Sequence, residues 1–312
     1  MIETINLVLA CDDNYAQHAA ITLMSAYEKS KNKSNIESFV LDGGISKDKK
    51  EKIQRSIEQY GGKVSFIKID EDDYKDMYTS YQYSQAIYYR LALPNLLNKK
   101  KCIYVDCDLL FLDDIEKLWN INLNGHPVGA IEDIGLTTSK KRFLEKQKSI
   151  GLKAGSSYFN SGVVIMDLEQ WREKSYSSLA MELAANNDFT SHDQDVLNKL
   201  FMDNWEQIDL RWNVIPPITY MYPKIIFNKK ERERSIRARK NPGILHYAGR
   251  YKAWEFKEYP EFNAFYYELL RKSAFKDVAM PQLSKQNVGR NFDKEVRRLK
   301  LADLLTRFLG SN

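Results

Sequence analysis

The sequence predicts an α/β fold built on a mostly parallel β-sheet with helices on both faces. The first observation behind this prediction is an alternation along the chain of short apolar runs with segments of helical periodicity, as occurs in parallel sheets with crossover helices. The second is size. A chain of 312 residues with 43% hydrophobic and 29% charged residues can form one large domain with a core of its own.

The first half of the chain carries the clearest alternation. We expect strands at 5–10, 39–41, 64–69 and 102–105, and helices at 16–29, 47–60 and 85–97. Gly61 and Gly62 close the second of these helices, whereas Pro94 perturbs the third helix or marks its last turn. This order of elements is typical of parallel strands joined by helices.

The second half mixes strands and helices without an obvious linker before about residue 273. We expect strands at 128–131, 162–166 and 243–247, and helices at 168–187 and 193–201. The chain is therefore predicted to form one main domain at residues 1–272 and a C-terminal extension at residues 273–312.

The extension is predicted to be a basic amphipathic helix. Apolar residues recur there at helical spacing, namely Phe292, Val296, Leu299, Leu304 and Phe308. Lys and Arg residues lie between them, so that one face is apolar and the other cationic. Such a helix either binds an anionic membrane surface or packs on its own domain or a partner subunit.

Cysteine usage and hydropathy predict a cytoplasmic location. The three cysteines form no C-x-x-C pair. The N-terminus lacks the basic start and the long apolar run of a secretory signal, and no run approaches the roughly 20 apolar residues of a membrane span. We therefore expect a cytoplasmic protein, attached at most peripherally to the inner face of the cell membrane.

The net charge of +5 is concentrated in two basic stretches, at residues 224–240 and from residue 286 to the end. Either stretch fits an anionic partner or simply a solvated surface. Neither has the interleaved aromatic residues on which nucleic acid bases stack, so nucleic acid is not an expected partner.

The pair Asp106 and Asp108 is the first candidate for chemistry. Both follow an apolar strand, and residues two apart in extended chain share a face, so both carboxylates point the same way where the strand ends. Ligand sites gather at that edge of parallel sheets, and two carboxylates there suit Mg²⁺ or Mn²⁺. The same spacing also occurs at Asp70 and Asp72 and at Asp193 and Asp195. A purely structural pair is therefore the alternative.

Two further segments have a similar character. Asp12, Asp13 and Asn14 follow the first strand, where such residues either contact a nucleotide or form a turn. The last predicted strand delivers His246, followed by Gly249 and Lys252, and a glycine and lysine after a strand can cradle a diphosphate. His246 is either structural or a metal ligand, and an imidazole beside two carboxylates favours Mn²⁺ over Mg²⁺.

Together these segments resemble glycosyltransferase family 8, which includes bacterial lipopolysaccharide α-galactosyl- and α-glucosyltransferases and, more distantly, glycogenin. The resemblance covers about residues 4–272 and rests on motifs that occur in order. These are ACDDNY, YYRLALP, YVDCDLLFLDDI, GAIED, YFNSGVVIMDL, HDQDVLN and HYAGRYKAW. It implies that residues 1–272 form a catalytic domain with the Rossmann-like GT-A fold.

The resemblance also implies roles for individual residues. The uridine of a UDP-sugar would be held by Ala10, Asp12, Asn14 and Tyr15, with Tyr15 stacking on uracil. The metal ligands would be Asp106, Asp108 and His246, and the diphosphate would be bound by Gly249 and Lys252. The donor sugar would be surrounded by Arg90, Asp133, Asn160, Asp193 and Gln194, with Gln194 nearest the anomeric carbon.

The function expected from the resemblance is Mn²⁺-dependent retaining transfer of a hexose from a UDP-sugar to a glycan acceptor, with Mg²⁺ as the alternative cofactor. Galactose is favoured slightly over glucose, and the acceptor would be a bacterial surface glycan, a lipopolysaccharide or a glycoprotein. A glycogenin-like protein that glucosylates one of its own 19 tyrosines is one alternative. A non-catalytic UDP-sugar-binding protein and a metal-dependent phosphohydrolase are the others.

Overall fold

A seven-stranded sheet forms the centre of the protein, with the strand order β3-β2-β1-β4-β7-β6-β8. The computed structural model describes residues 3–79, 84–137, 139–219, 229–249, 252, 254 and 260–278. The strands of the sheet are β1 (Ile5–Asp12), β2 (Ile36–Gly43), β3 (Val64–Lys68), β4 (Lys101–Val105), β6 (Val128–Glu132), β7 (Phe159–Asp167) and β8 (Glu206–Ile208). A second, two-stranded sheet pairs β5 (Leu109–Phe111) with β9 (Ile244–His246).

The sheet is parallel where the sequence alternates most clearly. Neighbours among β3, β2, β1 and β4 run parallel, β7 runs antiparallel to both β4 and β6, and β8 is parallel to β6. The prediction of a mostly parallel sheet with helices on both faces is thus confirmed. The two antiparallel neighbours of β7 follow from the chain reversing direction after β6, which the alternation pattern does not reveal.

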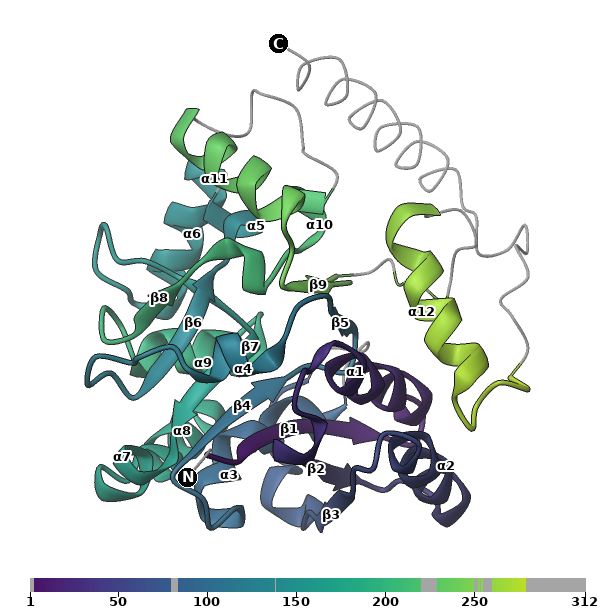
Figure 1. The fold of residues 1–312 in the computed structure, drawn as a ribbon. Helices are drawn as coiled ribbons and strands as arrows, with labels where there is room; N and C mark the ends of the chain where they lie inside the picture. The colour runs from purple at the N-terminus through teal and green to yellow at the C-terminus, as the bar shows by residue number, and fades with distance from the viewer. Residues whose placement is uncertain are drawn as a thin grey trace, which may run out of the picture.

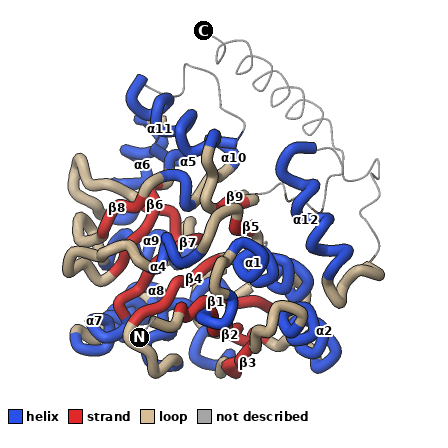
Figure 2. Tube along the Cα trace, viewed as in Figure 1, coloured by secondary structure: helices blue, strands red, loops and turns tan. Residues whose placement is uncertain are grey.

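Helices cover both faces of the sheet, and the sheet separates the core into two buried clusters (Figures 1 and 2). Side chains alternate between the clusters along β1: Leu7 and Leu9 belong to one, Val8 and Ala10 to the other. The first cluster also includes residues of α1 (Ala16–Lys29), α2 (Lys47–Glu58), α4 (Ile115–Trp119), α5 (Ile134–Thr137), η4 (Leu210–Trp212), α10 (Pro216–Thr219), α11 (Lys229–Lys240) and α12 (Pro260–Lys272). The second includes residues of η2 (Glu71–Tyr74), η3 (Gln85–Tyr88), α3 (Tyr89–Leu96), α6 (Lys140–Ile150), α7 (Leu168–Glu173), α8 (Tyr176–Ala185) and α9 (His192–Leu200).

Several predicted elements need correction. The helix expected at 168–187 is two helices, α7 and α8, because Ser175 between them adopts a left-handed conformation with φ of 54°. The segment at 85–97 begins as the 3₁₀ helix η3 and becomes α-helical at Tyr89, and Pro94 lies in the last turns of α3. The short elements β5, β8 and η1 (Lys33–Asn35) and the polar helix α6 were not expected from the sequence.

The division at residue 272 stays a prediction. Helix α12 ends at Lys272 and packs beside α1 (Figure 1), where the Tyr266 hydroxyl lies 2.7 Å from Nδ1 of His18. The apolar positions of the basic amphipathic helix predicted in the extension, from Phe292 to Phe308, lie outside the described residues. None of the helices in the described ranges is long and apolar enough to span a lipid bilayer.

Candidate active site

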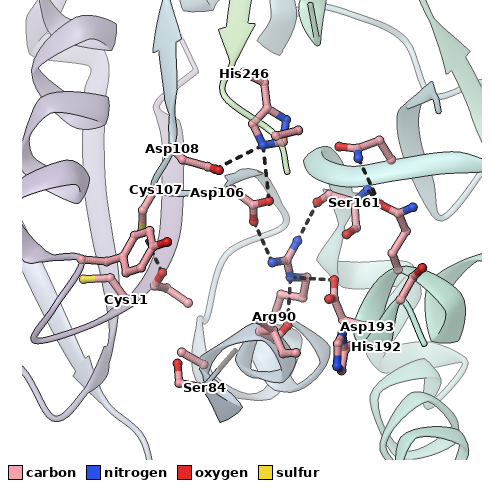
Figure 3. Close-up of a pocket in the computed structure, with 18 of the residues that line it drawn as sticks. Cys11, Ser84, Arg90, Asp106, Cys107, Asp108, Ser161, His192, Asp193 and His246 are labelled. Atoms are coloured by element: carbon pink, nitrogen blue, oxygen red, sulfur yellow. Dashed lines mark hydrogen bonds and ion pairs between the residues drawn. The ribbon is translucent and has the colours of Figure 1, made fainter. Parts of the chain in front are cut away.

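A cavity of about 550 Å³ opens where strands β1 and β4 end. Successive strands lie on opposite sides of β1, with β2 and β3 on one side and β4 on the other, and this reversal of strand order leaves a crevice beyond the carboxyl ends. The residues that line it include Ala10, Asp12, Asn14, Tyr15, Arg90, Asp106, Asp108, Asn160, Asp193, Gln194, His246, Gly249 and Lys252 (Figure 3). These are all of the predicted site residues except Asp133, which contacts Gln194 directly.

The two carboxylates after β4 converge with His246 because of the small second sheet. Asp108 immediately precedes β5 and His246 ends β9, and the antiparallel register places Leu109 opposite His246. The His246 Nε2 atom lies 3.1 Å from Asp108 Oδ1 and 3.8 Å from Asp106 Oδ2. One ligand atom from each of the three residues lies within 4.8 Å of the others, which makes this group a candidate site for one divalent cation.

Each carboxylate turns one oxygen toward His246 and the other toward a positively charged side chain. Asp106 Oδ1 accepts a hydrogen bond from Arg90 at 2.7 Å, and Asp108 Oδ2 accepts one from the Lys252 ammonium. Burial by itself would raise the pKa of Asp108, but Lys252 and His246 lower it far below its ordinary value. The carboxylate is therefore ionised at neutral pH, as a metal ligand must be.

Gly162 on β7 lets this cluster close. The Asp106 amide donates to the Gly162 carbonyl at 2.9 Å, so the glycine faces the carboxylate across the β4–β7 ladder. A Cβ at Gly162 would lie 2.3 Å from His246 Cε1 and 2.8 Å from Asp106 Oδ2. Any side chain here would occupy the space in which the three candidate ligands meet.

Arg90 connects the candidate metal ligands Asp106, Asp108 and His246 to the rest of the cavity (Figure 3). This buried side chain, from the first turn of α3, pairs with Asp106 and places Nε 3.1 Å from Asp193 Oδ2. It also donates to the Ser161 carbonyl at 2.6 Å and stacks over Tyr104. Arg90 thus holds two carboxylates in fixed positions at the floor of the site.

Asp193 and Gln194 enter the cavity from the first turn of α9. His192 before them has a φ of 46°, a left-handed conformation that is uncommon outside glycine and is concentrated at functional sites. Gln194 Oε1 accepts hydrogen bonds from Asn160 Nδ2 at 3.0 Å and from the Ser161 amide at 3.1 Å. Its Nε2 donates to Asp133 Oδ2 at 3.0 Å and to the Tyr158 hydroxyl at 3.2 Å.

The other end of the cavity is formed by the loop after β1. Asp12 Oδ1 accepts the Tyr15 amide at 3.1 Å, which is the turn-forming contact expected of such a residue. Asn14 and Tyr15 are exposed at the rim, and Ala10 lies at the wall. Asp13 faces away from this wall, pairing with Lys49 at 2.6 Å, and so stabilises the packing of the loop on α2.

Gly249 lies on the remaining side, with a φ of 90° and open space around its Cα. The geometry therefore combines a candidate divalent cation site, a lysine, an exposed aromatic ring and a donor-rich wall in one cavity. A sequence model of glycosyl transferase family 8 matches residues 6–258 of this chain.

The chain belongs to glycosyl transferase family 8.

Relatives of this family 8 chain match most of its length. General stress protein A from Bacillus subtilis (strain 168) is 28% identical over 291 residues, which cover 90% of this chain and 98% of that protein. A lipopolysaccharide 1,2-glucosyltransferase from Escherichia coli (strain K12) is 24% identical over 88% of this chain and 80% of its own length. The galactosyltransferase LgtC, solved with donor and acceptor sugar analogs, superposes with a TM-score of 0.73 at 24% identity, over 91% of this chain and all of that one. The fold is thus the GT-A fold of LgtC.

The structure adds residues to this family 8 site that sequence reasoning missed. Asn213 bonds to His246 and Asn160, Tyr158 bonds to Gln194, and Gly162 faces the ligand cluster. Asn213 follows a short 3₁₀ helix and has no spacing that marks a ligand. Tyr158 and Gly162 lie within the motif YFNSGVVIMDL, but a tyrosine and a glycine beside or within a buried strand usually indicate packing and not chemistry.

One prediction concerns Asp193. Burial raises its pKa to about 6, against an opposing effect of Arg90. The folded protein therefore takes up a proton between pH 6 and 4 that the unfolded chain does not, so stability from this group is present below about pH 4 and lost as pH rises through 6. In metal-free buffer, we expect Asp193→Asn to gain stability relative to wild type between pH 4 and 7.5, by about 3 kcal/mol for a shift of roughly two pKa units.

Urea unfolding across that pH range measures the difference. Asp113→Asn is the control, because Lys117 and Arg211 lower the pKa of Asp113 despite its partial burial. Its difference from wild type should stay flat between pH 4 and 7.5. An equally flat difference for Asp193→Asn would contradict the assignment.

Proposed function

We propose that this chain is a Mn²⁺-dependent, retaining hexosyltransferase that uses a UDP-hexose donor and a glycan acceptor. The observation that carries the proposal is the convergence of Asp106, Asp108 and His246, with Lys252 on the other oxygen of Asp108, in the lining of a cavity of about 550 Å³. Cavities of this size accommodate small ligands. Galactose is favoured slightly over glucose, and Mg²⁺ is the alternative metal.

The donor would lie along the cavity from β1 to α9. Uridine would contact Ala10, Asp12 and Asn14 with its base on the exposed ring of Tyr15, and the diphosphate would approach the open backbone of Gly249. Lys252 lies where it can turn from Asp108 toward a phosphate. Burial by itself would lower the pKa of its ammonium, but the neighbouring Asp108 carboxylate raises it, so the ammonium stays charged. A cation at this position stabilises the charge that develops on departing UDP.

The bound metal would act as a Lewis acid toward the diphosphate. The protein's contribution on the sugar side comes from Arg90, Asp133, Asn160, Asp193 and Gln194. Asp193 Oδ2 is buried and accepts no well-aligned hydrogen bond from the described residues, although Arg90 Nε lies 3.1 Å away. Asp193 lines the cavity, and a carboxylate there can accept a hydrogen bond from a sugar hydroxyl.

Retention of the α configuration would follow from attack on the face that UDP leaves. In that step the acceptor oxygen bonds to the anomeric carbon, the bond from that carbon to the phosphate oxygen breaks, and the acceptor proton passes to the departing phosphate. Gln194 Oε1 already accepts two hydrogen bonds, from Asn160 and Ser161, and an amide is a weak nucleophile. Gln194 is therefore assigned to positioning the sugar and not to a covalent intermediate.

The acceptor is proposed to be a bacterial surface glycan, lipopolysaccharide or glycoprotein. This rests on relatives named as a lipopolysaccharide 1,2-glucosyltransferase and a galactosyltransferase. A cytoplasmic location, with peripheral contact to the inner face of the membrane or a subunit contact through residues 273–312, is part of the same proposal. The described cysteines are buried and free of disulfides, which fits a reducing compartment.

The proposal is tested by UDP release from a panel of nucleotide sugars, with and without Mn²⁺. We expect slow Mn²⁺-dependent release from one UDP-hexose, accelerated when the correct glycan is added. UDP binding without release from any donor, even with glycans present, would support a non-catalytic UDP-sugar-binding protein. An increase of the intact mass by whole hexose units would identify the glycogenin-like alternative. Cleavage of phosphoesters that lack uridine as fast as of UDP-sugars would identify a phosphohydrolase.

A further inference from the structure

Asn213 is a buried asparagine between His246, a candidate metal ligand, and Asn160, one of the residues proposed to surround the donor sugar. It follows η4 and is only 2% exposed. Its Oδ1 lies 2.8 Å from His246 Nδ1, and its Nδ2 donates to Asn160 Oδ1 at 2.8 Å. Both polar atoms of one side chain are thus used to join two predicted site residues.

The direction of these hydrogen bonds is determined by the backbone. The Gly162 amide, which can only donate, lies 3.0 Å from one side-chain atom of Asn160, so that atom is the oxygen. The Asn213 atom facing the same oxygen must then be its nitrogen, which leaves the Asn213 oxygen toward His246. An oxygen that only accepts requires a proton on His246 Nδ1. With the proton on Nδ1, Nε2 is the nitrogen that faces Asp106 and Asp108 and that would ligate a metal.

The same reasoning extends to Gln194. The Ser161 amide donates to Gln194 Oε1 at 3.1 Å, which identifies that atom as the oxygen, and Asn160 Nδ2 donates to it at 3.0 Å. The chain of hydrogen bonds thus runs without ambiguity from His246 through Asn213 and Asn160 to Gln194. Two backbone amides of β7 anchor it.

We propose that Asn213 is a positioning residue that sets the imidazole tautomer of His246 for metal binding and couples that ligand to the placement of Gln194. A buried acceptor on the far nitrogen is how proteins orient a ligating imidazole, and its loss typically weakens metal binding about 10–100-fold. The proposal rests on the metal site of the proposed function. It assigns a role to Asn213 itself, which is not among the residues that line the cavity.

The test compares Mn²⁺ binding and turnover in two variants of Asn213. Asn213→Ala removes both hydrogen bonds, so we expect Mn²⁺ affinity, followed by the EPR signal of the free ion, to fall about 10–100-fold. The imidazole nitrogen modulation in the pulsed EPR spectrum of bound Mn²⁺ should weaken as well. Asn213→Asp keeps an acceptor for His246 but places a carboxylate oxygen against Asn160 Oδ1. It should retain most of the affinity while kcat at saturating Mn²⁺ falls about tenfold or more.

Asn6→Ala is the matched control. Asn6 is also buried and donates to the Lys101 carbonyl at 2.9 Å, but it lies at the opposite ends of β1 and β4. Its loss should lower stability without changing Mn²⁺ binding. Wild-type Mn²⁺ affinity and nitrogen modulation in Asn213→Ala would overturn the first part of the proposal, and unchanged kcat in Asn213→Asp would overturn the coupling. Absence of Mn²⁺ binding in the wild-type protein would instead overturn the proposed metal site.

Discussion

Asp108→Asn is expected to lower the rate of Mn²⁺-dependent UDP release by about 10³-fold or more. The substitution preserves the shape of a side chain that is only 8% exposed, so the fold should persist. It removes the charge that faces His246 on one oxygen and Lys252 on the other. The metal ion and Lys252 would then both lose the Asp108 carboxylate, which is proposed to hold them beside the diphosphate of the donor.

The measurement is UDP release together with Mn²⁺ titration of the folded variant. Asp72→Asn is a matched control, because Asp70 and Asp72 have the same sequence spacing but belong to the exposed helix η2 and its N-cap. The control should keep the rate and the Mn²⁺ affinity of the wild type. Near wild-type turnover in Asp108→Asn would show that the metal assignment is wrong.

Gly162→Ala is expected to lower turnover about 10²-fold or more and to weaken Mn²⁺ binding, although it adds a single methyl group. The new Cβ would meet His246 Cε1 at 2.3 Å and Asp106 Oδ2 at 2.8 Å, closer than side chains tolerate. Because Gly162 pairs with Asp106 in the β4–β7 ladder, the backbone has little freedom to retreat. The candidate ligands would have to separate instead.

Gly129→Ala separates this effect from a general loss of packing. Gly129 lies on neighbouring β6, where a Cβ would meet Leu123 Cδ2 at 2.6 Å and Ile208 Cδ1 at 3.1 Å. Overpacking of this kind costs about 1–3 kcal/mol of unfolding free energy. We expect the Gly129 variant to be destabilised yet to bind Mn²⁺ normally. Equal Mn²⁺ affinities for the two variants and the wild type would contradict the role given to Gly162.

Local patterns were sufficient for the longer strands and helices of the first half of the fold, but not for its short elements η1 and β5. Helix α1 begins and ends where its periodicity predicts, and β1 and β4 lie where their apolar runs do. In the second half, the break between α7 and α8 depends on the left-handed Ser175, and no glycine marks it. The polar helix α6 has a weak apolar face, so its sequence alone resembles a solvated loop.

The predicted residues of the candidate site come mostly from strand ends. Asp12, Asp106 and His246 each follow or end an apolar run, and the parallel strands β1 and β4 bring Asp12 and Asp106 to one edge of the sheet. The pairing that brings His246 to Asp108 could not be predicted, because β5 and β9 are three residues long and more than 130 positions apart. Short strands carry too few residues for a periodic signal.

The sequence by itself determined the α/β alternation, the family and the set of side chains expected at the site, because these depend on residue types and on local spacing along strands and helices. Only the tertiary structure decided how those side chains are oriented. Which oxygen of Asp106 faces Arg90, and which nitrogen of His246 faces Asn213, depends on contacts between residues far apart in the chain. Hydrogen-bond direction is determined by partners in space, and a sequence pattern does not contain them.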